Sequence, residues 1–376
     1  MTRFLHTADW QLGMTRHYFD AHAQGRFAQA RIDAVRGLAQ LASQQDCAFV
    51  VVAGDVFDSN QPDRTTLGRA LDALEAFTVP VYLLPGNHDP LDPGSIYRTP
   101  AFVDRCPAHV EVLDDRQPRT PVGEVEVVGV PWDSKHPLPN LVADACADLP
   151  DDGRIRVVVG HGAADLISGD FAQPGTFKVA EIEAAIEAGR LSYLALGDRH
   201  STTAVGDTGR IFYSGAPEPT DYVERDPGNA LVVDLSADGV MVQPHRVGSW
   251  DYRIVTGSVD DDDDLTLLFD ELDAIEDKER TIVKVKVDGS LTLSQAARLE
   301  AELDARAQVF AALEHPERHR DITIRPQTEE LDDLPLVGYA AVARDRLREL
   351  AASNGPDADE AVDALALLVR LHAEVG

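Results

Sequence analysis

The chain has 376 residues, of which 44% are hydrophobic, and its 65 acidic and 34 basic residues leave a net charge of −31. At roughly 150 residues per domain, this length predicts two or three domains, with enough apolar residues for a core. The negative charge argues against a protein that coats nucleic acid or binds anionic membranes, but not against an enzyme with a local cation site. No apolar run reaches the 18 or so residues that a membrane span needs, so we expect no integral membrane protein.

The cellular compartment is predicted from the N-terminal segment and the cysteines. The first ten residues, MTRFLHTADW, hold one basic residue and a short apolar stretch, which does not match a secretory signal. The cysteines at positions 47, 106 and 146 are far apart and form no CxxC pair, so neither a disulfide framework nor a thiolate zinc site fits them. We therefore expect a cytoplasmic protein.

Residues 1–248 alternate short apolar runs with helical patterns and then continue with strands in series. Helical spacing of apolar residues predicts helices over 24–43 and 65–77. Short apolar runs predict strands over 3–8, 49–53, 79–84, 125–130, 155–160, 193–196, 211–213, 231–235 and 240–247. This order favours a layered α/β domain with two packed sheets.

The order of predicted strands and helices changes near residue 249 and indicates a small α+β capping domain over residues 249–330. Strands are predicted over 252–259, 281–287 and 321–325, and helices over 265–275 and 294–313. The acidic run 260–264 precedes the first of these helices. A cation-binding loop is one interpretation, and we favour a solvated loop whose last acid caps the helix.

Residues 331–376 form a predicted helical tail. Pro335 can open a first helix that continues to Leu350, and a second helix is expected from Asp357 to about Ala373. The second helix carries an apolar stripe made of Val362, Leu365, Leu368 and Leu371, with Leu367 and Val369 alongside. Such a face commonly lies against a partner helix, so we expect docking on a partner, with packing on the capping domain as the alternative.

Five of the predicted strands end in side chains that can bind a metal. In chain order these are Asp9 and Gln11; Asp55 and Asp58; Asn87, His88 and Asp89; His161; and Asp198 and His200. In α/β architectures the ligand site lies beyond the carboxyl ends of the strands, so the five clusters should converge on one rim. Mixed Asp, Asn and His ligands suit Mn²⁺ or Fe²⁺, and two such ions bridged by one carboxylate can activate water for attack on phosphorus.

The strings around these residues resemble a known family. They are HTADWQLG, GDVFDSNQP, LLPGNHDP, VVGHG, YLALGDRH and YSGAPEPTDY. With them the chain resembles calcineurin-like metallophosphoesterases, and more narrowly the SbcD-like nuclease subunits of DNA-repair complexes. The resemblance implies a two-sheet β-sandwich core flanked by helices, followed by a cap and C-terminal helices. It also implies an exo- or endonuclease acting on DNA ends with an SbcC-like coiled-coil ATPase, with a homodimer as one arrangement within that complex.

The same resemblance implies the ligands of two divalent ions, with Mn²⁺ the first choice and Mg²⁺ or Fe²⁺ as alternatives. One ion would be held by Asp9, Gln11, Asp55 and His200, and the other by Asp55, Asn87, His161 and Asp198. Asp55 would bridge the two. His88 would stabilise the phosphoryl transition state or protonate the leaving oxygen, and we place Asp58 with it among the catalytic candidates.

Two of these positions depart from the family pattern. SbcD-like nucleases usually have His where this chain has Gln11. They also usually have a GHxH motif, and the matching residues 197–200 of this chain read GDRH, so that Asp198 stands at the first His position. An amide is a poorer ligand than imidazole, whereas a carboxylate adds negative charge and makes the site richer in oxygen, which favours Mn²⁺ or Mg²⁺. A decayed site with a structural role is the alternative.

Three basic residues near the clusters are candidates for contact with substrate phosphate. Arg199 lies between two expected ligands, with a salt bridge to an acid as the alternative, and Arg16 and His17 follow the first motif, with a surface loop as the alternative. The chain has no GxxxxGK[ST] motif, so we do not expect it to hydrolyse ATP itself. Two alternative functions remain open, a non-catalytic scaffold subunit of the ATPase complex and a phosphodiesterase for small substrates.

Overall fold

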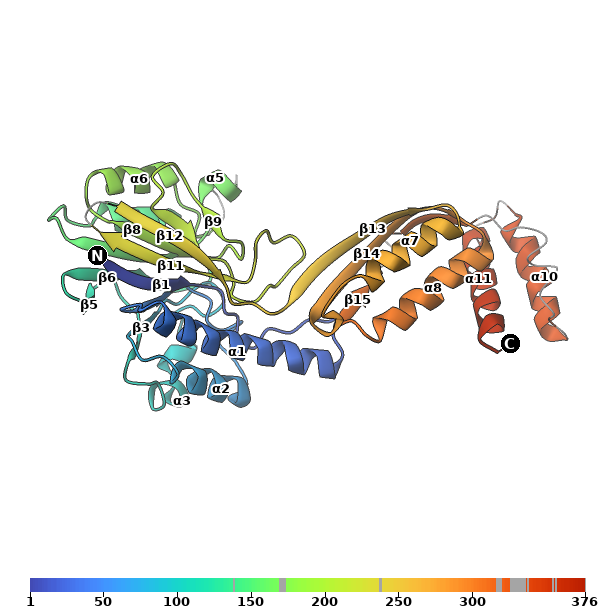
Figure 1. Cartoon of the computed structure of the whole chain (residues 1–376), viewed down its shortest axis with the longest axis horizontal. Coiled ribbons are helices and arrows are strands. Elements are labelled where there is room, and N and C mark those ends of the chain that lie inside the picture. Colours follow the sequence, from blue (N-terminus) through green and yellow to red (C-terminus); the bar gives the residue numbers. More distant parts are fainter. Residues whose placement is uncertain are drawn as a thin grey trace. The chain divides into compact units, whose positions relative to one another are not determined.

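The structure, a computed structural model, describes residues 1–137, 139–168, 174–236, 239–315, 320–324, 336, 338–353, 355 and 357–375. The chain divides into two compact units, Met1–Trp250 and Asp251–Gly376 (Figure 1). Apart from residues 249 and 250, the residues predicted as a capping domain and as a tail fall in the second unit.

The first unit is built on two six-stranded sheets. The first sheet has the order β12 (Gly239–Arg246), β11 (Asn229–Ser236), β1 (Thr2–Thr7), β2 (Val50–Val52), β3 (Val81–Leu83) and β4 (Val110–Val112). The second has the order β5 (Arg119–Val122), β6 (Val125–Val130), β7 (Ile155–His161), β8 (Tyr193–Gly197), β10 (Ile211–Tyr213) and β9 (Thr203–Ala204). The central strands β1 to β3 and β6 to β8 pair in parallel, so in each sheet their carboxyl ends lie at one edge.

Apolar side chains from both sheets form the core between them. Phe4 and Phe49 stack with their ring centroids 4.9 Å apart, and they share one buried cluster with Val127, Val159 and Tyr193 of the second sheet. Side chains alternate along each strand, and those that point away from this core pack under helices. The central strands are therefore buried on both faces, which explains their continuous apolar runs.

Helices cover the outer faces of both sheets (Figure 1). The first sheet packs under α1 (Ala21–Gln44) and α2 (Arg64–Leu74), and the second under α4 (Leu141–Ala147) and α6 (Val179–Glu187). Asp20 caps α1 by accepting from the Ala23 backbone, and Asp63 caps α2 in the same way. Shorter elements are η1 (Ile96–Arg98), α3 (Pro100–Val103) and α5 (Asp165–Ser168). The predicted two-sheet sandwich flanked by helices is thus confirmed.

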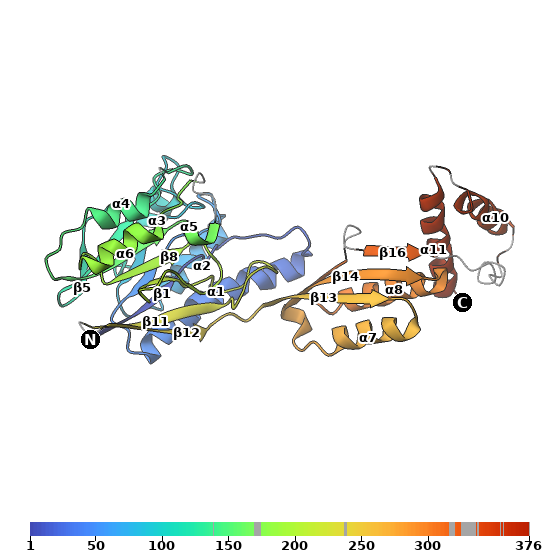
Figure 2. The same ribbon diagram turned by 90° about the horizontal axis from the view of Figure 1, so that it is seen from above.

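The second unit has one small parallel sheet (Figure 2). Strand β14 (Thr281–Leu291) pairs on one side with β13 (Asp251–Val259) and on the other with β15 (Ala312–Glu314) and then β16 (Arg320–Ile324). Helices α7 (Asp262–Asp273) and α8 (Leu293–Ala307) share its apolar core, and η2 (Lys278–Arg280) precedes β14. Helices α10 (Tyr339–Ala351) and α11 (Ala358–Val375) follow, and α11 packs on α8.

Three expectations for this unit need correction. The helix predicted over 294–313 ends at Ala307, because Leu313 belongs to β15 and pairs with Val283. The acidic run is largely exposed, as favoured, but its cap is Asp261, which accepts from the backbone N–H groups of Asp263 and Asp264, rather than the last acid. The centre of the apolar tail stripe is not free, because Leu365 is fully buried and packs against Leu293 of α8.

Some tail predictions lie outside the described residues. These are the helix start at Pro335 and the side chains of Val369 and Leu371, whereas Leu367 is 45% exposed. Among the helices that the structure describes, none combines the length and the apolar character needed to cross a membrane.

Candidate metal centre

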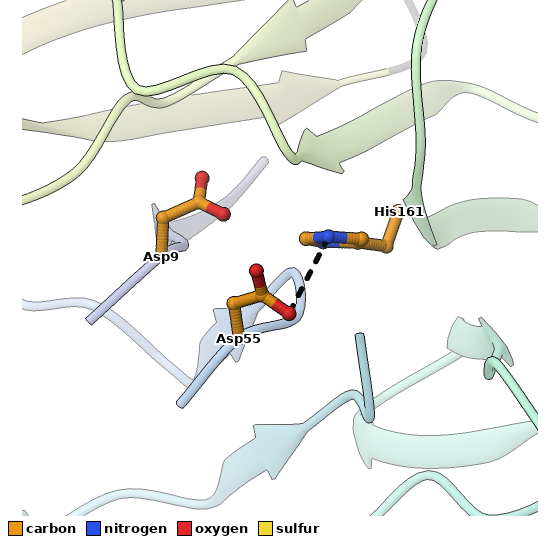
Figure 3. A group of neighbouring side chains, drawn as sticks. All are labelled: Asp9, Asp55 and His161. Carbon is orange, nitrogen blue, oxygen red and sulfur yellow. Dashed lines mark ion pairs between the residues drawn. The ribbon is translucent and has the colours of Figure 1, made fainter. Parts of the chain in front are cut away.

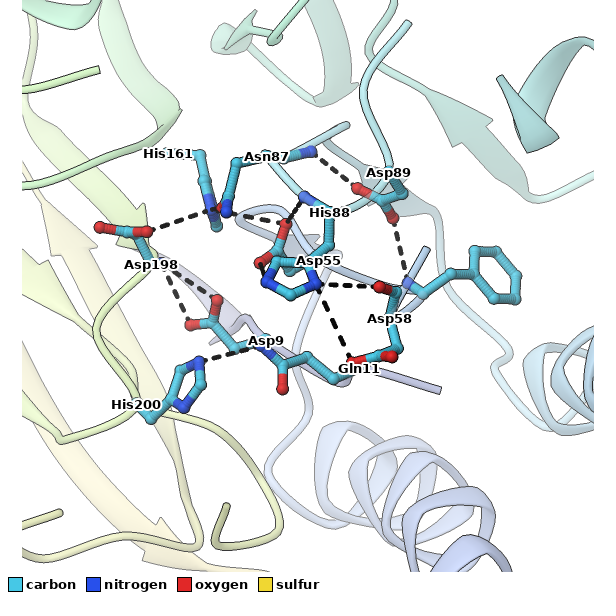
Figure 4. A network of polar contacts seen from close by, with 12 residues as sticks. Asp9, Gln11, Asp55, Asp58, Asn87, His88, Asp89, His161, Asp198 and His200 are labelled. Atoms are coloured by element: carbon cyan, nitrogen blue, oxygen red, sulfur yellow. Dashed lines mark hydrogen bonds and ion pairs between the residues drawn. The ribbon is translucent and has the colours of Figure 1, made fainter. Parts of the chain in front are cut away.

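The side chains of the five predicted clusters lie together where the central strands of both sheets end (Figure 4). Asp9 follows β1, Asp55 follows β2, and Asn87 and His88 follow β3. His161 is the last residue of β7, and Asp198 and His200 follow β8. The two packed sheets therefore present their ligand-bearing ends to one shared site.

Asp9, Asp55 and His161 form the buried centre of this site (Figure 3). One ligand atom from each lies within 4.8 Å of the others, and all three side chains are at most 2% exposed. His161 Nε2 and Asp55 Oδ1 are 3.5 Å apart and form an ion pair when the imidazole is protonated. Two carboxylates and an imidazole at this spacing form a ligand set for a divalent cation.

The protonation of this centre shows how strongly it needs positive charge. Burial raises the pKa of Asp9 to about 7, although His200 and His161 act in the opposite direction. Burial lowers the pKa of His161, but the carboxylates of Asp55, Asp9 and Asp198 outweigh this effect and raise it to about 9. Protons thus reduce the crowding of negative charge in the bare cluster, and a bound cation would replace them.

The backbone around the centre is strained in a way that is typical of functional sites. Among the described residues, eight non-glycine residues have a positive φ, and four of them are expected ligands: Asp9 (54°), Gln11 (44°), Asp55 (54°) and Asp198 (97°). Such a conformation costs of the order of 1–3 kcal/mol per residue and persists only where the surrounding structure enforces it. Here it directs side chains from three separate loops, those after β1, β2 and β8, into one small space.

On one side of the centre, Gln11 and His200 lie beside Asp9. Gln11 Nε2 is 3.1 Å from His200 Nε2, and Gln11 Oε1 is buried with no hydrogen-bond partner among the described residues. A buried acceptor without a partner needs an explanation, and a cation at this position would supply one. The His200 ring is held from behind, since its Nδ1 lies 2.6 Å from Thr220 Oγ1 and 3.1 Å from Glu224 Oε1. Its Nε2 is therefore directed at the cluster.

On the other side, Asn87 and Asp198 lie near His161. Asn87 Oδ1 is 2.6 Å from His161 Nε2, and Asp198 Oδ1 is 3.8 Å from the same nitrogen. The His161 Nδ1 lies 2.8 Å from the backbone oxygen of Ala53 and donates to it. Nδ1 is thus engaged with Ala53, and Nε2 faces Asn87 and the carboxylates. A bound cation would take the place of the Nε2 proton, which is the arrangement of a metal-binding imidazole.

His88 lies at the rim of the cluster, with its side chain 38% exposed. Its Nδ1 is 2.9 Å from the backbone oxygen of Asp58, and its Nε2 is 3.9 Å from Asp55 Oδ2. The Asp58 carboxylate is 3.9 Å from Nδ1, so it is the Asp58 backbone oxygen, and not the carboxylate, that accepts a hydrogen bond from His88. His88 is thus oriented by the Asp58 loop and can reach substrate from the solvent side.

Two supporting arrangements were not predicted from the sequence. Asp89, which the sequence places among the metal-binding side chains, has a supporting role instead: it is fully buried and accepts from the backbone N–H groups of Gly86 and Phe57 and from the Tyr97 hydroxyl, at 2.8, 3.0 and 2.5 Å. Burial raises its pKa to about 6. Asp89 therefore joins the loop that carries His88 to the loop that follows Asp55. The sequence signal was its place in GNHD, whereas Tyr97 had none.

The second unpredicted arrangement is the support of His200. Glu224 accepts from the backbone N–H of Thr220, at 3.0 Å for its closer oxygen, and also contacts the Thr220 hydroxyl. A carboxylate behind a metal-binding imidazole fixes the orientation of the ring and raises its basicity. Thr220 lies in the string YSGAPEPTDY, but nothing in that string indicated contact with His200.

The expected phosphate-binding residues have local partners. Arg199 Nε donates to Thr203 Oγ1 at 2.8 Å, and Arg16 Nη2 donates to the Thr220 carbonyl at 2.6 Å. His17 is exposed and packs its ring edge-to-face on Tyr18. Arg16 thus holds the Thr220 loop, and contact of any of the three with phosphate stays a prediction.

Comparison with known proteins gives the family. The calcineurin-like phosphoesterase family matches residues 2–200, more than half of the chain. The chain belongs to that family. It is similar to the DNA double-strand break repair protein Mre11 of Methanosarcina mazei, with 25% identity over 272 residues that cover 69% of this chain and 40% of the relative. It is also similar to the SbcD subunit of the nuclease SbcCD of Rhodobacter capsulatus, with 28% identity over 269 residues that cover 59% of this chain and 63% of the relative.

The chain thus spans less than two thirds of these relatives. A solved structure, TT1561 of Thermus thermophilus, aligns over 65% of this chain and 99% of its own length, with 13% identity and a TM-score of 0.42. The predicted resemblance to calcineurin-like metallophosphoesterases and to SbcD-like nucleases is confirmed, and with it the class of metal-dependent hydrolase; the similarity to Mre11 adds a second nuclease relative.

The residues of the cluster fit the divalent metals that the family uses. Asp9 and Asp55 supply buried carboxylates, and His161 supplies an oriented imidazole. Gln11 supplies a buried oxygen that has no partner within the described part of the chain. This donor set is rich in oxygen and suits Mn²⁺, Mg²⁺ or Fe²⁺.

Proposed function

We propose that the chain is a phosphodiesterase with two divalent ions, Mn²⁺ first among them, which cleaves DNA at its ends together with an SbcC-like coiled-coil ATPase. The observation that carries this proposal is the convergence of ligand-bearing strand ends from both sheets on the buried Asp9–Asp55–His161 centre. Support for DNA as the substrate comes from the relatives, which are named as a DNA-break repair protein and a nuclease subunit.

In this proposal the residues around the centre divide into two ligand groups. Asp9, Gln11 and His200 would hold one ion, Asn87, His161 and Asp198 the other, and Asp55 both. Bound divalent ions supply charge for the phosphoryl oxygens and lower the pKa of a water so that it can attack phosphorus. The chain's own part is to hold the ligands in a buried pocket, with His161 fixed by Ala53 and His200 by Thr220 and Glu224.

His88 has a separate part in the reaction. Its Nδ1 donates to the Asp58 carbonyl, so the proton on that nitrogen is fixed and Nε2 faces the cluster. In the cationic form, Nε2–H can stabilise a phosphoryl oxygen or protonate the leaving oxygen of the DNA strand. The exposure of this ring lets it meet a substrate that approaches from solvent.

The negative charge of the chain favours work with a partner. A net charge of −31 repels the DNA backbone, so the isolated chain should bind DNA weakly and lose that binding as salt is added. A basic partner such as the ATPase would supply the missing attraction. On this view we expect tight DNA binding only in the complex.

The test is Mn²⁺-dependent hydrolysis of linear duplex DNA and of bis(p-nitrophenyl) phosphate, with and without the ATPase. Cleavage of both substrates, with DNA cleavage increased by the ATPase, would support the proposal. Hydrolysis of the small diester alone would favour a small-substrate phosphodiesterase.

A second candidate function is a non-catalytic subunit that scaffolds the ATPase. It is favoured by Gln11, an amide at a position where the family usually has His, because a weaker ligand lowers occupancy of the first metal position. Metal analysis of the purified chain separates the two candidates. Bound metal without hydrolysis of either substrate, or no bound metal in excess Mn²⁺, would favour the scaffold.

A further inference from the structure

A hollow of about 480 Å³ adjoins the candidate metal centre. Its lining includes three residues of the cluster, Asn87, His88 and Asp198, together with Trp132, Lys135 and His136. None of the last three has a part in the proposed reaction. The hollow therefore extends the site from the reacting centre toward a second group of side chains.

Trp132 fixes the start of the loop that carries Lys135 and His136. Its indole Nε1 donates to the His161 carbonyl at 2.8 Å, and its backbone oxygen accepts from Leu91 at 2.9 Å. The indole also lies close against Gly175, where an added Cβ would come within 2.1 Å of the ring. The loop is thus tied at its start to two of the segments that carry the cluster, and Lys135 and His136 follow three and four residues later, where they line the hollow.

Lys135 is unusual in this chain. The sequence has only five lysines, and the other one in the first unit, Lys178, pairs with Glu181. Lys135 is exposed and forms no hydrogen bond or ion pair with any described residue. In a protein with a net charge of −31, an ammonium group without a described partner at the edge of an anion-processing site is available to bind a ligand anion.

We propose that Lys135 and His136 form a binding subsite for the phosphate that neighbours the phosphate being cleaved. The inference rests on the proposed function and narrows its substrate to a diester that continues into a second phosphate, as in a polynucleotide strand. Lys135 would contact that phosphate as a point charge, and His136 as a hydrogen-bond donor. A lone diester has no group to place there, so the subsite would favour a strand over a small ester.

The test compares Lys135→Ala with Lys178→Ala in the full chain. Two quantities are measured in Mn²⁺, kcat/KM on an oligonucleotide and kcat/KM on bis(p-nitrophenyl) phosphate. We expect the ratio of the first to the second to fall roughly five- to tenfold in Lys135→Ala, as expected for the loss of one charge-assisted contact, and to be unaltered in Lys178→Ala. Lys135→Arg should restore most of the ratio, because it returns the positive charge.

A binding measurement gives a second readout. The binding of a labelled single-stranded oligonucleotide is measured by fluorescence anisotropy, without Mn²⁺ and at several salt concentrations. The slope of log K against log salt concentration should be shallower by about 0.7 in Lys135→Ala than in the wild type. An unaltered salt dependence and an unaltered substrate ratio, in a protein that cleaves the oligonucleotide, would overturn the subsite alone. A wild-type protein that cleaves only the small diester would overturn the proposed function and the subsite together.

Discussion

Gly54 offers a sharp test of how the first sheet holds the metal centre. It precedes Asp55 and has φ +96°, and a Cβ placed on it would lie 2.1 Å from His161 Nδ1. That nitrogen donates to the Ala53 carbonyl at 2.8 Å. Gly54→Ala must therefore either move the His161 ring or change the backbone conformation before Asp55, and both movements disturb the cluster.

The size of the effect follows from two costs. Holding an L-residue in left-handed backbone costs roughly 1–2 kcal/mol. Displacing the His161 ring breaks its bond to Ala53 and leaves a buried group unsatisfied, which costs roughly 1–3 kcal/mol. We therefore expect Gly54→Ala to lower the free energy of unfolding by about 2–5 kcal/mol and to bind one Mn²⁺ fewer than the wild type.

Gly37 provides the matched control, because the same substitution there should have the opposite sign. It lies inside α1, its φ is not positive, and a Cβ on it would meet no atom within 4 Å. Gly37→Ala should raise the free energy of unfolding by about 0.5–1 kcal/mol, since alanine is the better helix residue. Urea unfolding and Mn²⁺ calorimetry measure both effects. If Gly54→Ala keeps wild-type stability and metal binding, the close approach of this loop to His161 is wrong.

Three further substitutions test separate parts of the account. His88→Ala should keep the bound metal but lower kcat roughly 10²-fold or more; loss of metal in this variant would mean that His88 is a ligand instead. Gln11→His should tighten one Mn²⁺ binding step in calorimetry, since imidazole is a better ligand than an amide, and unchanged affinity would remove Gln11 from the ligand set. Burial lowers the pKa of His6 to about 3, whereas an unfolded chain has a histidine pKa of about 6.5, so the unfolded state binds the extra proton between these values. The contribution of His6 to stability is therefore present above pH 6.5 and is lost as the pH falls toward 3, by at most roughly 1.4 kcal/mol per pH unit. Urea unfolding from pH 7 to pH 4.5 measures the free energy of unfolding of the wild type and of His6→Gln. As the pH falls, the wild type should lose more of this free energy than the variant. A constant difference between the two would show that His6 does not resist protonation.

The parts of the fold that the sequence predicts are those with a local signal. Central strands such as β2 and β3 are continuous apolar runs because both faces are covered, and α1 carries a long apolar stripe. Short edge strands such as β5 and β9 have mixed burial and no apolar periodicity, and they were missed. The end of α8 was also missed, because Ala312 and Leu313 are apolar in a helix pattern and only their pairing with β14 makes them a strand.

In the metal centre, too, the sequence predicts some residues and not others. The expected ligands of the centre lie at the end of an apolar strand or within a few residues after it, so short sequence strings are enough to find them. The groups that orient them are distant in sequence: Glu224 acts on His200 through space, and the Trp132 indole meets the His161 carbonyl across 29 positions. No local pattern encodes such contacts, and the tail illustrates the same limit, because the burial of Leu365 depends on Leu293 of another helix.

The central claim is that two divalent ions share Asp55, and counting bound Mn²⁺ tests it most directly. Because Asp55 has φ 54°, alanine would strain the backbone, whereas asparagine tolerates this conformation and removes only the charge, so Asp55→Asn is the better variant. Calorimetry and metal analysis should find two Mn²⁺ per wild-type chain, and at most one, with loss of diester hydrolysis, in Asp55→Asn. Two tightly bound ions and wild-type hydrolysis in Asp55→Asn would contradict the account.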